Sequence, residues 1–274
     1  MAGDLDADAI ADRLIRAYDD RTTIPLLSDT IPGFDVAQAY DVLFAIEARR
    51  GTEGWTPVGW KIGFTNRALW PRYDVWQPMW ARVWDHTLHR TSDGTHVLDL
   101  APFVQPRIET EVVFCLGEPL APTDDAREVL ARTAWIAAGF EIVQCHFPVW
   151  RFTAADCTAA CGLHGALVVG RPLVLDDATR DDLLVALPEA QVTLCRDTTE
   201  VDSGVGSLVL DSPALSLAHL SRVLDAQGVA PLGTGDIVTT GTITDAWPID
   251  ADETWTSDYG SLGIEGLTVT CTRS

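Results

Sequence analysis

The chain has 274 residues, and its hydrophobic share of 47% is enough for a sizeable buried core. Its 40 acidic and 19 basic residues give a formal net charge of −21, which argues against nucleic acid or an anionic membrane as a partner. No apolar stretch approaches the roughly 18 residues that a membrane span needs, and the acidic N-terminus does not resemble a signal peptide. We therefore expect a cytoplasmic protein.

The N-terminal part of the chain is predicted to be helical. Ile10 and Leu14 lie on one apolar stripe of a first helix, and Asp35 is suited to cap a second one. The proline- and glycine-containing stretch 22–34 between them predicts a loop. We assign residues 1–56 to a helical N-terminal region.

Beyond residue 56 the pattern changes to short strands and turns. Strands are predicted at 58–64, 107–116, 165–169, 191–196, 236–240 and 267–272, and helices at 124–138, 177–186 and 213–227. Strands dominate and the helices interrupt them irregularly, so the pattern is not a βαβ repeat. The predicted class is α+β, with a β-rich domain over residues 57–274 that can also be counted as one domain with the helical region.

Two glutamates stand two residues apart in the alternating segment 107–116. In a strand, Glu109 and Glu111 share one face, about 6.5 Å apart at the backbone, and that face continues with Val113 and Cys115. Two like charges on a face that turns apolar are costly unless a cation lies between them. The alternative is an exposed strand face on which both glutamates meet water.

A third glutamate, Glu141, lies in the apolar segment 137–143. An arginine could neutralise a lone buried carboxylate there, but three glutamates in apolar, strand-like contexts fit a metal better. Ligands that offer only oxygen select Mg²⁺, Mn²⁺ or Ca²⁺ over zinc. We therefore predict that Glu109, Glu111 and Glu141 hold a divalent cation, with Mg²⁺ or Mn²⁺ as the expected cofactor.

Lys61 is the only lysine among the 19 basic residues. A buried lysine can lose its proton, whereas arginine effectively cannot, so a site that needs an ammonium group specifically would retain a lysine. Chance survival of a single lysine is the alternative. The flanking Gly59 and Gly63 allow another segment of backbone to approach closely. Lys61 is our first candidate for a catalytic residue.

Two longer motifs follow one another along the chain: Val58-Gly-Trp-Lys-Ile-Gly-Phe-Thr-Asn66 and Pro106-Arg-Ile-Glu-Thr-Glu111. Shorter ones are Gly139-Phe-Glu-Ile-Val143, Gly204-Val-Gly206, Gly235-Asp-Ile-Val-Thr-Thr-Gly241 and Leu262-Gly263. Together they resemble the fumarylacetoacetate hydrolase superfamily, and within it the branch of 2-keto-4-pentenoate hydratases and 4-oxalocrotonate decarboxylases. The resemblance runs from about residue 10 to the C-terminus.

The resemblance implies a curled mixed sheet, a metal on the Glu-x-Glu pair and a later glutamate, a small 2-oxo acid as substrate, and a homo-oligomer. The implied metal ligands correspond to Glu109, Glu111 and Glu141, and the family's lysine corresponds to Lys61. The implied activity is that of a metal-dependent lyase that hydrates a 2-oxo-enoic or 2-hydroxydienoic acid. Two alternatives stay open, a 4-oxalocrotonate-type decarboxylase and a hydrolase of a C–C bond in an acylpyruvate or β-diketone.

The chain departs from the family's pattern at two places. Met79 stands where hydratases of the branch often carry an aspartate, whereas decarboxylases tend to be apolar there. The stretch 160–165 replaces the family's Asp-Asn-x-Ser-Ser segment, and His164 is the titratable group that it offers. His164 and His146 are further candidate catalytic residues, and C–C hydrolysis would require one of them to activate water.

Four tryptophans lie between residues 70 and 84, interleaved with arginines. Such an aromatic stretch is typical of a core or a subunit contact, and the functional alternative is an apolar lid over the metal. On the second interpretation the residues expected to bind substrate are Gly63, Met79, Trp80 and Arg82.

Overall fold

The structure is a computed structural model and describes residues 5–274. Its α-helices are α1 (Ala7–Asp19), α2 (Leu27–Thr30), α3 (Val36–Thr52), α4 (Trp70–Tyr73), α5 (Ala126–Arg132), α6 (Ala154–Ala159), α7 (Asp177–Glu189) and α8 (Pro213–Ala226). Within the described residues, no helix has the length and apolar character needed to cross a membrane.

The strands form two sheets. The larger sheet has the order β2-β1-β11-β5-β6-β7-β3, with β12 also paired to β5 and β8 to β6, and the smaller sheet has the order β10-β9-β13-β14-β4. The strands of the larger sheet are β1 (Pro57–Gly63), β2 (Met79–Trp84), β3 (Leu88–Arg90), β5 (Arg107–Leu116), β6 (Thr133–Val143), β7 (His164–Val169), β8 (Leu173–Val174), β11 (Ile237–Thr239) and β12 (Trp247–Pro248). Those of the smaller sheet are β4 (Thr95–Asp99), β9 (Gln191–Arg196), β10 (Thr199–Val205), β13 (Thr254–Asp258) and β14 (Thr268–Thr272).

Both sheets are mixed, and the larger one curls. Strands β1 and β11, β3 and β7, and β4 and β14 pair in parallel, while the other pairs are antiparallel. Strand β2 contacts β7 although the two stand far apart in the strand order, so the sheet bends round on itself. The α+β class with a β-rich mixed core is therefore confirmed.

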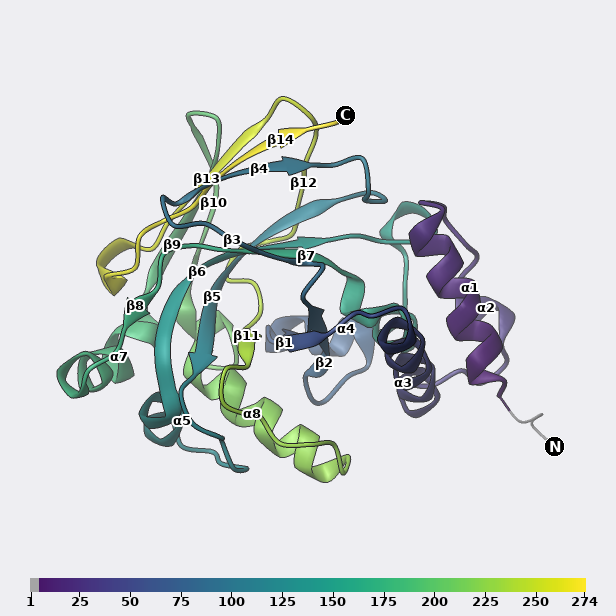
Figure 1. Cartoon of the computed structure of the whole chain (residues 1–274), viewed down its shortest axis with the longest axis horizontal. Helices are drawn as coiled ribbons and strands as arrows, with labels where there is room; N and C mark the ends of the chain where they lie inside the picture. The colour runs from purple at the N-terminus through teal and green to yellow at the C-terminus, as the bar shows by residue number, and fades with distance from the viewer. Residues whose placement is uncertain (1–4) are drawn as a thin grey trace.

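The curled sheet has two faces with different roles. Its outer face carries Ile108, Val112 and Phe114 of β5, which belong to a large core with the smaller sheet and the helices α5, α7 and α8. Helix α8 runs beside this sheet in Figure 1. Its inner face carries Val113, which packs against Leu167 of β7 and other buried residues.

The N-terminal helices form a separate cluster at one side of the molecule (Figure 1). Helix α3 begins with a capping box in which Asp35 accepts from the backbone of Gln38, as the sequence predicted for Asp35. The predicted loop 22–34 also contains the short helix α2. The division of the chain at residues 56 and 57 stays a prediction.

Most of the predicted helices and strands are present, but the predicted helix 124–138 is a strand in its second half. The helix expected over 124–138 is a shorter helix, α5, followed directly by the long strand β6. Alanine favours helix in isolation, but residues 133–143 pair along the whole length of β5, and tertiary pairing outweighs local propensity. The small residue Gly139 also leaves room for Val113, since a Cβ there would lie 2.4 Å from Val113 Cγ2.

Strands β1 and β11 approach each other closely at Gly59. A Cβ on Gly59 would lie 1.9 Å from the carbonyl oxygen of Ile237 in the partner strand. We expect Gly59→Ala to lower the free energy of unfolding by about 3 kcal/mol, because backbone rather than a flexible side chain must move. Urea unfolding followed by tryptophan fluorescence would measure the change. Gly51→Ala is the matched control, since a Cβ there meets nothing within 4 Å. Equal stability of the Gly59→Ala and wild-type proteins would contradict this account.

Candidate metal centre and active site

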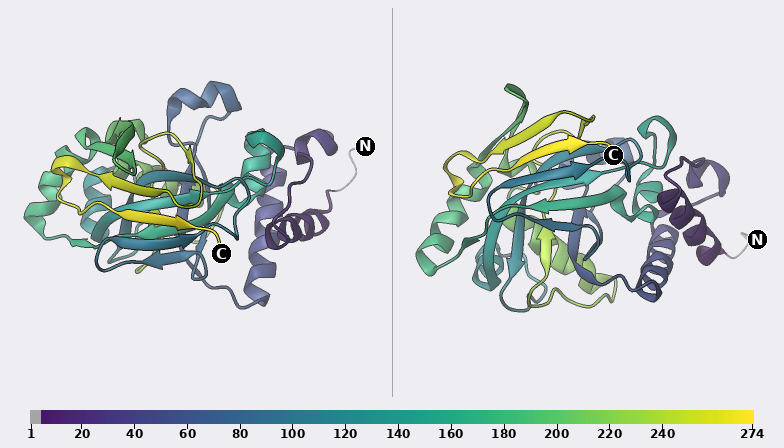
Figure 2. Two further views of the ribbon diagram at one scale, coloured as in Figure 1. Left: turned by 90° about the horizontal axis from the view of Figure 1, so that it is seen from above. Right: turned by 45° about the horizontal axis from the view of Figure 1, so that its top comes forward.

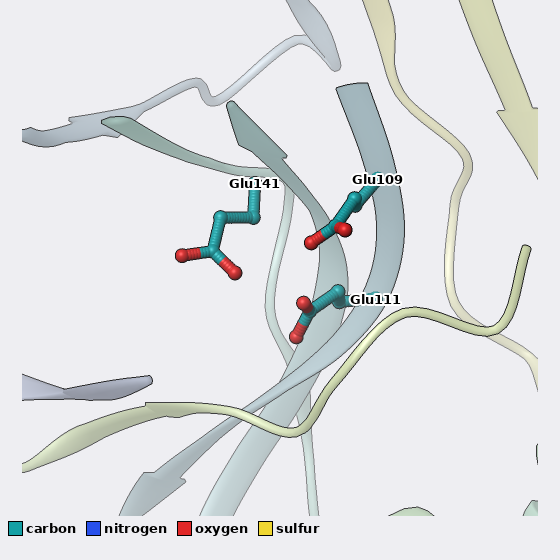
Figure 3. Close-up of side chains that lie close together, drawn as sticks. All are labelled: Glu109, Glu111 and Glu141. Atoms are coloured by element: carbon teal, nitrogen blue, oxygen red, sulfur yellow. The ribbon is translucent and has the colours of Figure 1, made fainter. Parts of the chain in front are cut away.

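Three glutamates from two neighbouring strands point at one another on the inner face of the curled sheet (Figure 3). Antiparallel pairing sets Glu109 of β5 directly opposite Glu141 of β6, and Glu111 lies two residues further along β5. One carboxylate oxygen from each of the three lies within 4.8 Å of the others. Oxygens bound to one divalent cation lie about 3–5 Å apart, so a single ion could contact all three side chains.

The burial of these carboxylates sets their acidity. Glu111 and Glu141 are fully buried, and Glu109 is half-buried. Burial raises the pKa of Glu109 to about 7, against the opposing effect of Lys61. Burial, then the charges of Glu141 and Glu109, raise the pKa of Glu111 well above its ordinary value. The cluster therefore lacks the positive charge needed to keep all three carboxylates ionised at neutral pH.

Two fully buried carboxylate oxygens in the cluster are left without a hydrogen bond. Glu111 Oε2 accepts from the backbone N–H of Gly241 at 2.6 Å and from the hydroxyl of Thr239, whereas Glu111 Oε1 has no partner. Glu141 Oε2 likewise accepts no hydrogen bond, but the Lys61 ammonium lies 3.2 Å from it. A buried acceptor without a partner is costly, and a hard cation is the partner that such oxygens favour. The residues present therefore fit a divalent metal.

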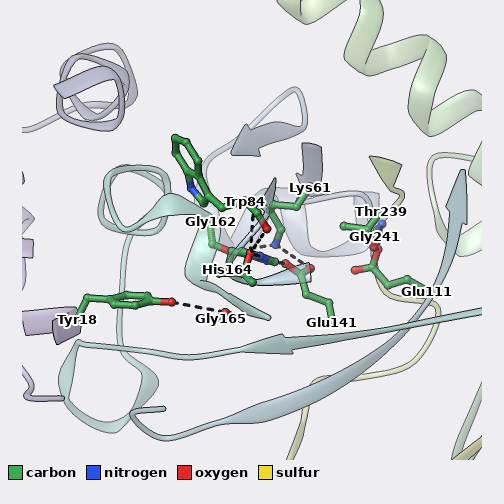
Figure 4. A network of polar contacts seen from close by, with 11 residues as sticks. Tyr18, Lys61, Trp84, Glu111, Glu141, Gly162, His164, Gly165, Thr239 and Gly241 are labelled. Carbon is green, nitrogen blue, oxygen red and sulfur yellow. Dashed lines mark hydrogen bonds and ion pairs between the residues drawn. The ribbon is translucent and has the colours of Figure 1, made fainter. Parts of the chain in front are cut away.

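Lys61 projects from β1 into the same cluster (Figure 4). Its Nζ lies 3.2 Å from Glu141 Oε2 and donates to the carbonyl oxygen of Gly162 at 2.9 Å. Burial alone would lower the pKa of Lys61, but the charges of Glu141, Glu109 and Glu111 outweigh it, so the pKa lies above its ordinary value. Burial would raise the pKa of Glu141, but Lys61 and His164 together outweigh it and the pKa of Glu141 is lowered. Lys61 and Glu141 thus form a buried ion pair.

His164 lies next to the three glutamates and hydrogen-bonds to Glu141. Its Nδ1 is 2.8 Å from Glu141 Oε1, and its Nε2 is 2.9 Å from the hydroxyl of Thr87. Both ring nitrogens are therefore already hydrogen-bonded. A histidine in this position orients the carboxylate that it contacts.

His146 lies elsewhere. Its Nδ1 bonds to the carbonyl oxygen of Thr22 at 3.0 Å, and its ring packs against Tyr18 of α1. Within residues 5–274, neither nitrogen of His146 bonds to any of the three glutamates. The structure therefore gives no support to the catalytic role expected for His146.

The four residues expected to bind substrate separate into two pairs. Met79 and Gly63 are opposite each other in β2 and β1, on the face that carries Lys61. Trp80 and Arg82 are on the opposite face, as their register with Ile62 and Trp60 shows. Trp80 is fully buried in the core and donates from its indole to Gln227 at 2.7 Å. Arg82 stacks on Trp60 at 3.5 Å, so the expected substrate contacts of Trp80 and Arg82 are wrong in geometry.

Several residues at the site carried no role in the sequence analysis. Thr239 and Gly241 fix Glu111, Thr87 fixes His164, and the Gly162 carbonyl holds Lys61. The motif that ends at Gly241 pointed to two of them, because a glycine directly after a strand often marks a close backbone approach. A Cβ on Gly241 would lie 2.0 Å from Thr65 Oγ1.

Comparisons with known proteins identify the family of this chain. The family described as "Fumarylacetoacetate (FAA) hydrolase C-terminal" matches residues 78–266, more than half of the chain. The chain belongs to the fumarylacetoacetate hydrolase family. This family member is 30% identical to a 2-hydroxyhexa-2,4-dienoate hydratase from Comamonas testosteroni, over 93% of this chain and 92% of the relative. It is 28% identical to a 4-oxalocrotonate decarboxylase from Pseudomonas sp. (strain CF600), over 93% of each chain.

A solved structure of the family shares the whole fold. It is a 4-oxalocrotonate decarboxylase from Pseudomonas putida G7, complexed with magnesium and adipate. The two chains superpose with a TM-score of 0.87 over 97% of each, at 24% sequence identity. This likeness shows that the present chain has the curled-sheet fold of the family.

The acidity of Glu109 leads to a prediction for this family member. A cation must displace the proton that Glu109 holds below its pKa of about 7. We expect the apparent affinity for Mg²⁺ to be highest above pH 7 and to fall by at least about tenfold per pH unit below it. Calorimetric titration between about pH 5.5 and about pH 8, in two buffers of different ionisation enthalpy, would measure both the affinity and the proton release. An affinity that does not change with pH would contradict the prediction.

Proposed function

We propose that this protein is a divalent-metal-dependent lyase that adds water to a 2-oxo-enoic acid derived from a 2-hydroxydienoic acid. The observation that carries the proposal is the inward-facing cluster of Glu109, Glu111 and Glu141, with two buried oxygens lacking hydrogen bonds and Lys61 at 3.2 Å from Glu141. The similarity to a 2-hydroxyhexa-2,4-dienoate hydratase over 93% of the chain supports it.

Glu109, Glu111 and Glu141 would hold Mg²⁺ or Mn²⁺. The magnesium complex of the related decarboxylase supports this assignment. When bound, the cation supplies Lewis-acid stabilisation of the negative charge on the carboxylate and 2-oxygen of the substrate.

Lys61 is the residue placed to move a proton. Its Nζ is held by the Gly162 carbonyl and Glu141, so the ammonium has a fixed position beside the carboxylates. Protonation of the dienol at C5, the far end of the diene, with loss of the enol proton, gives a conjugated 2-oxo-3-enoate. Lys61 would give the first proton from Nζ and take up the second. Water then adds across the C=C bond, with its oxygen at C4 and a proton at C3.

Decarboxylation is the second candidate, and Met79 favours it. The Met79 side chain lies beside Lys61, in the position where hydratases of the branch often carry a carboxylate. An apolar neighbour is a poor activator of water but suits the loss of a distal carboxylate as CO₂. The similarity to a 4-oxalocrotonate decarboxylase over 93% of each chain supports this candidate.

Hydrolysis of a C–C bond needs a histidine that is free to activate water. Both nitrogens of His164 are already hydrogen-bonded. His146 bonds to the Thr22 carbonyl through Nδ1, and its Nε2, which has no partner in the described chain, makes no hydrogen bond to the three glutamates. No contact described here therefore favours hydrolysis over the lyase reactions. Turnover that persists in a His146→Ala, His164→Ala double variant would exclude it.

One assay separates the two lyase reactions. The dienol absorbance of a panel of 2-hydroxydienoates would be followed with and without Mg²⁺ or Mn²⁺, with CO₂ measured in parallel. We expect metal-dependent loss of absorbance without CO₂ release from the monocarboxylates. Stoichiometric CO₂ from a dicarboxylate would favour the decarboxylase, and no metal-dependent turnover of any member would overturn the proposed lyase.

The proposal includes two expectations beyond the reaction. We infer that the protein works as a homo-oligomer and is located in the cytoplasm. Size-exclusion chromatography with light scattering would test the first, and cell fractionation would test the second.

A further inference from the structure

A cavity lies on the far side of Met79 from Lys61. It has a volume of about 250 Å³ and is lined by the start of α3, the residue after β1, the segment 74–79 and α6. Its walls are mainly apolar, and they include Val36, Phe64, Val75, Trp76, Met79 and Ala154. The part of the chain that carries α4, directly before this segment, projects from the body of the molecule (slate blue in Figure 2, left).

Met79 separates this cavity from Lys61. The Met79 side chain packs closely against Gly63 and Gly162, since a Cβ added to these glycines would lie 2.7 Å and 3.0 Å from its Sδ. The same Cβ on Gly162 would lie 2.8 Å from Lys61 Cδ, so Met79 and Lys61 pack against one glycine. Since Lys61 Nζ is 3.2 Å from Glu141, one side chain stands between the cavity and the cluster. Methionine is unbranched and flexible, so a ligand could displace this side chain at little cost.

Residues 64 and 65, which follow the strand that carries Lys61, form a second connection between the cavity and the glutamate cluster. Phe64 lines the cavity, and its backbone has a φ of 57°, which is rare for an aromatic residue. The next residue, Thr65, lies against Gly241, whose N–H binds Glu111. A molecule in the cavity would therefore be close to both the lysine and the residues that hold a metal ligand.

The chemistry of the walls selects an uncharged occupant. Asp74 is the charged residue that lines the cavity, and no arginine or lysine of the described chain does so. A carboxylate in the cavity would meet Asp74 without a cation, in a chain with a net charge of −21. Thr158 also lines the cavity, and its hydroxyl is buried and has no hydrogen-bond partner within the described residues.

We propose that this cavity binds the uncharged, mainly apolar tail of the substrate, and that Met79 is the partition through which the tail passes. The proposal rests on the proposed function, because the head of the same molecule is the 2-oxo acid at the three glutamates. The volume is larger than the ~150 Å³ apolar cavity that accepts a benzene ring, so short alkyl and phenyl tails both fit. The substrate class is then a 2-hydroxydienoic monocarboxylate with a substituent at its far end.

The first test uses unreactive 2-oxo acids with the wild-type protein in Mg²⁺. Calorimetry would compare 2-oxobutanoate, 2-oxohexanoate and 2-oxoadipate. We expect the affinity to rise about fourfold for each methylene that enters the cavity. We expect 2-oxoadipate, which ends in a second carboxylate, to bind at least about tenfold more weakly than 2-oxohexanoate. Equal affinity for the two monocarboxylates, or preference for the dicarboxylate, would overturn the proposal.

The second test fills the cavity. Ala154→Leu places a larger side chain on its wall, and we expect the ratio of affinities for 2-oxohexanoate and 2-oxobutanoate to fall towards one. Ala48→Leu, the same substitution at an exposed position of α3 that does not line the cavity, should keep the wild-type ratio. An unchanged ratio in a folded Ala154→Leu protein would overturn the proposal, and the wild-type series decides the question if that variant does not fold.

These measurements separate the cavity from the reaction. Tail-dependent binding without turnover of any dienoate would contradict the proposed function and leave the cavity assignment standing. Metal-dependent turnover, with affinity that does not change with the length of the tail, would contradict the cavity assignment and leave the proposed function standing.

Discussion

Lys61→Met is expected to lower kcat by about 10²–10⁴-fold, the range that a positioned proton donor contributes. Methionine has nearly the shape of lysine, so the packing against Gly162 is retained while the ammonium is lost. Glu141 then loses its 3.2 Å ion-pair partner but keeps the hydrogen bond from His164. The chemical step should fail although the protein stays folded. Turnover of a 2-hydroxydienoate under saturating Mg²⁺ would measure the loss.

The same variant should still bind metal. Removing the positive charge of Lys61 leaves three carboxylates facing one another, so the affinity for Mg²⁺ should stay near the wild-type value or rise. Calorimetric titration would separate this outcome from a collapsed site, in which affinity and activity fall together. Arg82→Met is the matched control, since it removes a cation from the opposite face of the same strand pair. Unchanged turnover in Lys61→Met would remove the lysine from the mechanism.

The pair of glutamates on β5 could be predicted because side chains in a strand alternate between faces. The period-two pattern placed Glu109, Glu111 and Val113 on one face, and the structure has them there. Apolar residues on the other face enter the large core, which fixes the register of the strand. Local patterning was therefore sufficient for this half of the site.

The other half depends on contacts between distant segments. Glu141 reaches Glu109 through the register of β5 with β6, and nothing local in residues 133–143 specifies that register. Its alanines instead suggested a helix as far as residue 138. Trp80 and Arg82 were misplaced for a related reason, because the face that β2 presents is set by its pairing with β1. Thr239 joins the site only because β11 lies next to β5.

Glu111→Gln is expected to weaken Mg²⁺ binding by at least about 100-fold, since changes outside the ligand set already cost about 10–100-fold. Gly241 N–H and the Thr239 hydroxyl both donate to Glu111 Oε2, so the amide oxygen should take that position. The amide nitrogen then replaces Oε1, the oxygen without a partner. A donor group stands where a cation needs an acceptor, and one negative charge is lost.

The metal-free Glu111→Gln protein should be at least as stable as wild type, because a neutral amide replaces a buried carboxylate whose pKa is already raised by burial. Stability and metal affinity thus move in opposite directions, which a general loss of structure cannot produce. Thr239→Val, which removes only the orienting hydroxyl, should weaken Mg²⁺ binding by about 10–100-fold. Glu47→Gln changes a glutamate that pairs with Arg82 instead, and should leave metal affinity unchanged. If calorimetry finds wild-type affinity in Glu111→Gln, Glu111 is not a ligand, and the cation must be held by Glu109 and Glu141 alone.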